Sequence, residues 1–190
     1  PGHWHGTHVA GCAAEVGDND KGGVGPGFKC KIMPLKCGVD QSNIRSIFRG
    51  YDAILYAAEN GADVINCSWG GPGGSPVGQE VINTANNMGS VVVVSAGNSY
   101  KNIDYGSAYP AAYDNVLCVG AIRSNNRKAS FSNYGHLVTV YGPGQGIYAT
   151  MPNNRYGSQS GTSMSGPVVA GICGQVLAIH PDWTPKKVIH

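Results

Sequence analysis

Charged residues are scarce in this chain: of 190 residues, 13 are Lys or Arg and 11 are Asp or Glu, which leaves a formal net charge of +2. This balance argues against a nucleic-acid partner, because such a partner requires a clustered basic face. No apolar run approaches the ~18–20 residues that cross a bilayer, so no membrane segment is expected. The length fits one domain, since ~100–200 residues per domain is usual.

The chain also has no C-x-x-C pair, although it contains six cysteines. All six lie among apolar or small neighbours, at Cys12, Cys30, Cys37, Cys67, Cys118 and Cys173. Such surroundings favour buried free thiols over a disulfide framework or a metal site. The first residues include no Met, basic stretch or apolar signal core, so we expect any targeting segment to lie outside this sequence.

Short apolar runs alternate with longer helical patterns. The runs at 31–35, 64–67, 91–94 and 116–119 are continuous, as in strands of a parallel sheet that are buried on both faces. Helical spacing predicts helices over about 44–58, 77–88 and 163–180. Pro167 is expected in the first turn of the last helix, where no N–H bond is lost. This order predicts a single α/β domain over 1–190, a three-layer α/β/α sandwich with a mostly parallel sheet.

Three polar segments, each next to a predicted strand or helix end, carry residues suited to acyl transfer. They are His5-Gly6-Thr7-His8-Val9-Ala10-Gly11, Val94-Ser95-Ala96-Gly97-Asn98 and Ser160-Gly161-Thr162-Ser163-Met164-Ser165-Gly166-Pro167. Ser163 would lie at a helix start, where free backbone N–H groups favour a developing negative charge. His5 is the candidate base that takes the hydroxyl proton, and the Asn98 amide can donate to a tetrahedral oxyanion. Together these roles indicate nucleophilic catalysis.

These segments together resemble the subtilisin-like serine proteases (subtilases, the peptidase S8 family). The likeness runs nearly end to end, through Tyr109-Pro110-Ala111, Ala129-Ser130-Phe131-Ser132 and Tyr141-Gly142-Pro143-Gly144. It implies a serine endopeptidase with His5 as base, Ser163 as nucleophile and Asn98 as oxyanion donor. His8 is then expected to pack within its helix, and catalysis needs no cofactor.

The resemblance also implies a substrate-binding edge, at which a peptide adds as an antiparallel strand along Ser68, Trp69 and Gly70. Trp69 would flank the pockets for the second and fourth residues before the cut. Ala108 would form the floor of the primary pocket, beside a wall at Gly97 and Asn98. A small, uncharged floor implies a large apolar or aromatic residue before the cleaved bond.

The resemblance has one large departure, in the third member of the catalytic triad. Subtilases order their triad Asp, His, Ser along the chain, but none of the residues before His5 is acidic. We therefore expect a fragment of the catalytic domain that lacks the N-terminal strands, the triad Asp and the C-terminal end. Such a fragment would fold poorly because its sheet lacks a central strand, and it would show little or no activity.

A structural Ca²⁺ is a further implication, at the loop Asp18-Asn19-Asp20, although a solvated acidic turn accounts for the same residues. Leu137 and Thr139 stand at the family's second calcium site and are poor replacements for carboxylates. The remaining implications concern partners and compartment: polypeptide substrates, an N-terminal pro-segment, a monomer, and secretion.

Two other classes of function stay open at this point, and one is argued against. The chain can be a non-catalytic, subtilase-like binding domain, or a kexin-like processing protease that cuts after basic pairs. The second requires carboxylates in its pockets, whereas Gly and Pro follow Trp69 here. The sedolisins use Glu in place of the base, so His5 argues against them.

Overall fold

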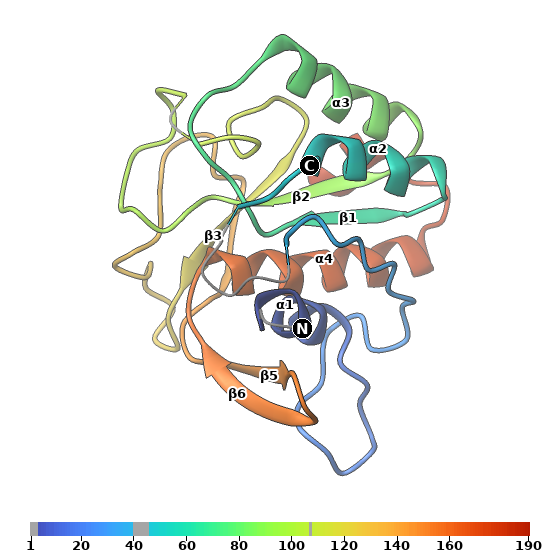
Figure 1. The fold of residues 1–190 in the computed structure, drawn as a ribbon, viewed down its shortest axis with the longest axis vertical. Helices are drawn as coiled ribbons and strands as arrows, with labels where there is room; N and C mark the ends of the chain where they lie inside the picture. The colour runs from blue at the N-terminus through green and yellow to red at the C-terminus, as the bar shows by residue number, and fades with distance from the viewer. Residues whose placement is uncertain (1–3, 40–45, 107) are drawn as a thin grey trace.

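The computed structural model describes residues 4–39, 46–106 and 108–190 (Figure 1). Its centre is a parallel sheet in the order β1-β2-β3-β4. The strands are β1 (Val64–Cys67), β2 (Val91–Ser95), β3 (Leu117–Ile122) and β4 (Val140–Pro143). Three of the continuous apolar runs are thus confirmed as strands.

Helices cover both faces of this sheet, which confirms the three-layer α/β/α architecture. On one face lie α2 (Gly50–Glu59) and α3 (Pro76–Asn87), and on the other lies α4 (Thr162–Ile179), packed against α1 (His5–Ala14) (Figure 1). A short α5 (Pro185–Ile189), which was not predicted, packs on the α4 face and begins at a proline.

The all-Val strand β2 shows why both faces need helices. Val92 and Val94 belong to the cluster formed with α2 and α3, whereas Val91 and Val93 pack with residues of α4. All four side chains are fully buried. Alternate side chains of a strand point to opposite faces, so a run without polar residues can only be stable between two layers.

An antiparallel hairpin leads into α4 and was not predicted. It consists of β5 (Ile147–Met151) and β6 (Arg155–Gln159). Two hydrogen bonds tie it to α1: the Thr150 hydroxyl donates to the Thr7 carbonyl (2.9 Å), and His8 Nε2 donates to the Gly157 carbonyl (3.0 Å). His8 is fully buried, so its expected structural role in the helix is confirmed.

The strand predicted at 31–35 is wrong. These residues form no strand, and Ile32, Met33 and Leu35 are exposed. The reason is that the groove separates this run from β1, the edge strand of the sheet. Within the described residues nothing pairs with the outer side of β1, so the run has no strand beside it. An apolar run becomes a strand only where a partner edge is in reach, and Pro34 also lacks an N–H for a ladder.

The helix predicted over 44–58 begins later, at Gly50. Residues 40–45 lie outside the described part of the chain. Arg49, just before the helix, has a φ of 54°, in the left-handed region, so the helix cannot continue back through it. The other two predicted helices correspond closely to α3 and α4.

The sequence expectations for α4 need two corrections. By length and composition α4 could cross a membrane, contrary to the expectation that no segment would. However, half of the helix is buried inside the protein. Its residues Met164, Ala170 and Cys173 pack in core clusters. Pro167 lies beyond the first turn, so it does remove a helical hydrogen bond. The freed carbonyl is that of Ser163, which accepts a hydrogen bond from the Ser68 hydroxyl (3.0 Å).

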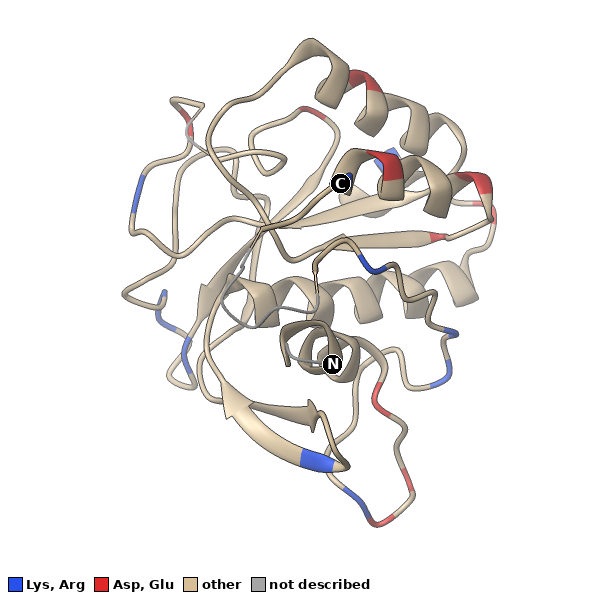
Figure 2. Ribbon diagram, in the orientation of Figure 1, with Lys and Arg blue, Asp and Glu red and all other residues tan. Residues whose placement is uncertain are grey.

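Charge and thiols follow the sequence expectations in part. In the view of Figure 2, Lys and Arg are scattered over outer loops and strand β6 and form no cluster. All six cysteines are free, and Cys12, Cys67, Cys118 and Cys173 are buried as expected. Cys30 is exposed and Cys37 only half-buried, because the segment that carries them is not part of the sheet.

Candidate active site

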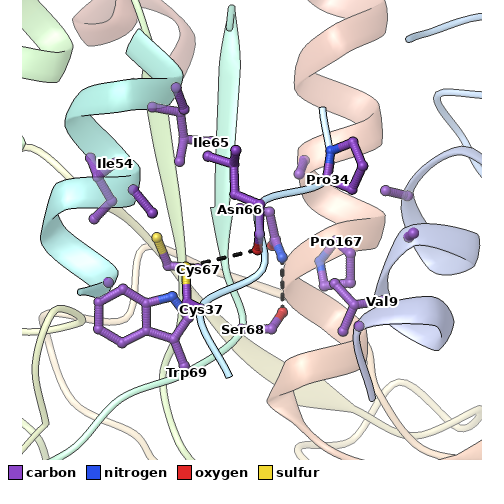
Figure 3. A pocket seen from close by; sticks show the side chains of 18 of the residues that line it. Val9, Pro34, Cys37, Ile54, Ile65, Asn66, Cys67, Ser68, Trp69 and Pro167 are labelled. Carbon is purple, nitrogen blue, oxygen red and sulfur yellow. Dashed lines mark hydrogen bonds between the residues drawn. The ribbon is translucent and has the colours of Figure 1, made fainter. Parts of the chain in front are cut away.

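One large groove brings the predicted catalytic residues together. His5 at the start of α1, Ser163 in the first turn of α4 and Asn98 just after β2 all line it, and so do Ser68, Trp69 and Gly70. The groove has a volume of about 2250 Å³ and continues along the free edge of β1 (Figure 3). It reaches the carboxyl end of the parallel strands, where ligands of open α/β sheets bind.

Ser163 is tied to the end of β1 by a reciprocal pair of hydrogen bonds. Its hydroxyl donates to the Ser68 carbonyl (3.3 Å), and the Ser68 hydroxyl donates to the Ser163 carbonyl (3.0 Å). Ser163 is only half-buried, so its hydroxyl remains open to the groove. Its backbone N–H is one of the unpaired donors of the first helical turn. A hydroxyl and an anion-stabilising donor therefore belong to the same residue.

The orientation of the Asn98 amide is fixed by Thr162. Asn98 Oδ1 accepts from the Thr162 N–H (2.8 Å) and from the Thr162 hydroxyl (3.0 Å). Because a backbone N–H can only donate, this contact assigns the oxygen and places the NH₂ group on the other side. The NH₂ group then lies next to Gly161, at the entrance to α4, where it can donate to a bound substrate.

Thr162 is a site residue that the sequence reasoning missed. It is fully buried, and besides its bonds to Asn98 its hydroxyl accepts from the Gly97 N–H (3.0 Å). Gly97 has a φ of +100°, and a Cβ there would lie 2.4 Å from Asn133 Nδ2. The position therefore requires glycine. The signal for Thr162 was its place inside the Gly-Thr-Ser block, beside the nucleophile.

Asn133 was also missed, and it shapes the turn that carries Asn98. Its Oδ1 accepts from the N–H groups of Ser99 and Lys101 (3.0 Å each), and its Nδ2 donates to the Ala96 carbonyl (2.7 Å). The side chain is buried, so these bonds are shielded from water. Nothing in the local sequence pattern distinguishes Asn133 from a surface turn residue.

Replacing Thr162 with Val is expected to lower the free energy of unfolding by about 1–3 kcal/mol, because it leaves the half-buried Gly97 N–H without the acceptor that the buried Thr162 hydroxyl supplies. Urea unfolding of the whole protein measures this loss. Thr162→Ser is the matched control, because it keeps the hydroxyl that accepts from the Gly97 N–H (3.0 Å) and should lose less. Equal losses in the two variants would contradict a special role for Thr162.

Only some of the predicted substrate-binding residues line the groove. Trp69 packs edge-on against Tyr51 (5.6 Å between centroids) and directly over Gly50, where a Cβ would lie 2.8 Å from its ring. This packing forms an aromatic wall of the groove. Gly97 and Ala108 do not line the groove, and Ala108 instead packs against the α2–α3 cluster.

The expected calcium loop gains no support from its geometry. Asp18, Asn19 and Asp20 are exposed, and Asn19 Oδ1 already accepts from the Lys21 N–H (3.1 Å). Nowhere in the described residues do three His, Cys, Asp or Glu side chains gather as metal ligands. At the position of the family's second calcium site, Leu137 has no oxygen in its side chain, and the Thr139 hydroxyl already accepts a hydrogen bond from the Cys118 N–H. These side chains would supply only part of the 6–8 oxygen ligands of Ca²⁺, so a calcium site here stays a prediction.

Comparisons with known proteins agree on one family. A family model described as "Subtilase family" matches residues 1–190. Among curated relatives, subtilisin DY of Bacillus licheniformis is 40% identical and aligned over 98% of this chain, and thermitase of Thermoactinomyces vulgaris is 43% identical over 91%. Among solved structures, a protease of Pseudoalteromonas arctica superposes with a TM-score of 0.88, at 32% identity and over 97% of this chain. The chain spans only 68%, 61% and 61% of these three proteins.

Proposed function

Because this chain belongs to the subtilase family, we propose that it is part of the catalytic domain of a serine endopeptidase. The observation that carries the proposal is that His5, Ser163 and Asn98 line one groove together with the edge at Ser68–Gly70. In this mechanism the Ser163 hydroxyl attacks the scissile carbonyl carbon while His5 takes its proton. His5 then protonates the leaving amine, and water hydrolyses the acyl-enzyme in the same way.

Two donors would stabilise the oxyanion of the tetrahedral intermediate. One is the Asn98 NH₂ group, which Thr162 turns toward the entrance of α4. The other is the Ser163 N–H in the first turn of α4, where the helix dipole also favours negative charge. Since both are positioned before substrate binds, they need little reorganisation during the reaction.

The substitution Asn98→Asp tests this role. It keeps the oxygen that accepts from Thr162 but replaces the donor by a carboxylate oxygen, so we expect kcat to fall by at least ~10²–10³ with little change in KM. Steady-state kinetics on a peptide substrate measure both constants. Asn115→Asp, in an exposed turn, is the control for the added charge. A kcat within threefold of the parent would exclude Asn98 as oxyanion donor.

The third triad member would come from a chain segment preceding His5. The groove supports this, because it follows the unpaired edge of β1 and is flanked by exposed Ile32 and Met33. Inside it, Asn66 Oδ1 is buried without a hydrogen-bond partner among the described residues. An extended strand would pair with β1, cover these apolar side chains and bring a carboxylate to His5.

Substrates are proposed to be polypeptides with an apolar or aromatic residue before the cleaved bond. The aromatic wall at Trp69 and Tyr51 supports apolar binding at the second and fourth residues before the cut. For the residue directly before the cut, the proposal rests on the family resemblance, which places the small, uncharged Ala108 at the pocket floor. The stretch Gly70–Gly73, which follows Trp69 in the groove, carries no carboxylate. A panel of peptides varied at that one residue tests the preference, and selective cleavage after Arg would favour the kexin-like alternative. Synthesis with a pro-segment, secretion and a monomeric state complete the proposal by family resemblance.

A serine-directed phosphonate probe tests the chemistry itself. In the full-length protein it should label Ser163, and His5→Ala should abolish the labelling because the hydroxyl loses its base. Peptide mapping identifies the labelled residue. A folded protein that shows no labelling would favour a non-catalytic binding domain.

A further inference from the structure

We propose that Cys37 and Cys67 form a reversible disulfide that ties the segment 31–39 to the end of β1, next to Trp69. The two residues come from different parts of the chain and line the same groove. This site is independent of the proposed catalysis, since neither sulfur takes part in peptide hydrolysis.

The placement of the two thiols is the main argument. Cys67 is the last residue of β1 and is 1% exposed, whereas Cys37 is half-buried. In Figure 3 the Cys37 and Cys67 side chains lie next to each other beside the indole of Trp69, and the Cys37 thiol donates to the Leu35 carbonyl (3.8 Å). The Cys37 backbone is held in place, because its carbonyl accepts from the Phe48 N–H (2.7 Å). A thiol that is reachable from solvent therefore lies beside a thiol that is not.

The titration of the pair agrees with this proximity. Burial raises the pKa of the Cys67 thiol to about 12, and the neighbouring Cys37 sulfur adds to the rise by charge repulsion. Burial also raises the pKa of Cys37. Because only thiolates attack disulfides, both steps of the exchange should be slow at pH 7. The rate should rise steeply with pH, since the thiolate fraction increases about tenfold per pH unit below the pKa.

The oxidant would be a low-molecular-weight disulfide such as oxidised glutathione. In the first step the Cys37 thiolate attacks one sulfur of the oxidant, which forms a mixed disulfide and releases one glutathione thiolate. In the second step the Cys67 thiolate attacks the Cys37 sulfur and expels the second glutathione. The protein loses two protons and two electrons, and the oxidant is reduced to two thiols.

The closed disulfide would fix one wall of the groove. It links the segment that carries Cys37 to the residue that directly precedes Ser68 and Trp69. The segment 31–39 forms no strand, and its far end is held by the bond from the Phe48 N–H to the Cys37 carbonyl. A disulfide would add a covalent link between this segment and β1. The oxidation state would therefore set how rigidly the segment is held beside Trp69.

The experiment is a peptide map of the full-length protein, which needs no activity. The protein is incubated with oxidised glutathione at pH 7 and pH 8.5, blocked with an alkylating agent and digested with trypsin without reduction. We expect the peptide 37–45 to be linked to 50–101, two hydrogens lighter than their sum, and formed faster at pH 8.5. Dithiothreitol should release both peptides.

Single substitutions decide the assignment. Cys37→Ser and Cys67→Ser should each abolish the linked peptide, whereas Cys30→Ser, which removes the exposed thiol just before the segment 31–39, should leave it unchanged. The proposal is overturned if Cys37 accumulates as the glutathione mixed disulfide while Cys67 stays alkylatable on unfolding. It is equally overturned if Cys37 pairs with Cys30 instead. A protein without peptidase activity would still give a decisive map.

Discussion

Replacing Ser163 with Ala is expected to lower kcat by ~10⁶, the loss seen when the nucleophile of subtilisin itself is removed. The loss is large because the acyl-enzyme can no longer form, and only substrate binding and the oxyanion donors remain. The fold should persist, since the Ser163 carbonyl keeps its bond from the Ser68 hydroxyl. Single-turnover kinetics on a chromogenic peptide, with the full-length protein, measure the residual rate.

Ser165→Ala is the matched control for this substitution. It removes a hydroxyl in the same helix that donates to the Thr162 carbonyl (3.1 Å), facing away from the groove. Its kcat should stay within a few-fold of the parent. If Ser163→Ala and Ser165→Ala lost activity equally, the effect would be one of helix stability and Ser163 would not be the nucleophile.

Extending the chain upstream by a strand that carries an acidic residue is expected to raise kcat by ~10⁴ over the 190-residue chain. This matches the cost of losing the triad Asp alone in subtilisin. The carboxylate would hold His5 in the tautomer that accepts the Ser163 proton. Turnover numbers of the two proteins, normalised to phosphonate-titrated sites, measure the gain.

A second extended protein, with that acidic residue changed to its amide, separates chemistry from folding. The strand should still cover the edge of β1, so the melting temperature should match that of the acidic version while turnover falls. The 190-residue chain should instead associate at high concentration, because a free edge and exposed apolar side chains favour pairing between molecules. Equal turnover in all three proteins would refute the assignment of an upstream triad member.

Sequence patterns predicted the elements whose signal is local. The run Val91–Val94 is stable only when it is buried on both faces of a sheet. Helix α3 is marked by its cap, since the Ser75 hydroxyl accepts from the Gly78 N–H (3.0 Å), and by the apolar spacing that follows. The run 31–35 also predicts a buried strand, although it contains Pro34, yet the structure shows no strand there. Whether this run forms a strand depends on which segment lies beside β1, and a local sequence pattern does not contain that information.

The residues of the site likewise divide into those with a local sequence signal and those without one. His5, Asn98 and Ser163 were found because their chemistry and the adjoining glycines are visible in short segments. Thr162 and Asn133 act on the turn after β2 from positions 64 and more than 30 residues away along the chain. The hairpin β5–β6 was missed because its residues are mostly half-buried or exposed and give no continuous apolar run.

Pro167 gives the first turns of α4 an unusual mechanical property. Pro167 has no N–H to donate to the carbonyl of Ser163, one turn earlier in the helix. That carbonyl therefore accepts from the Ser68 hydroxyl, directly after strand β1. The helix is thereby pinned against sliding along its own axis at the very residue that would attack the substrate. Restoring the amide proton with Pro167→Ala would create a competitor for that carbonyl, and the spacing between helix and strand would become adjustable.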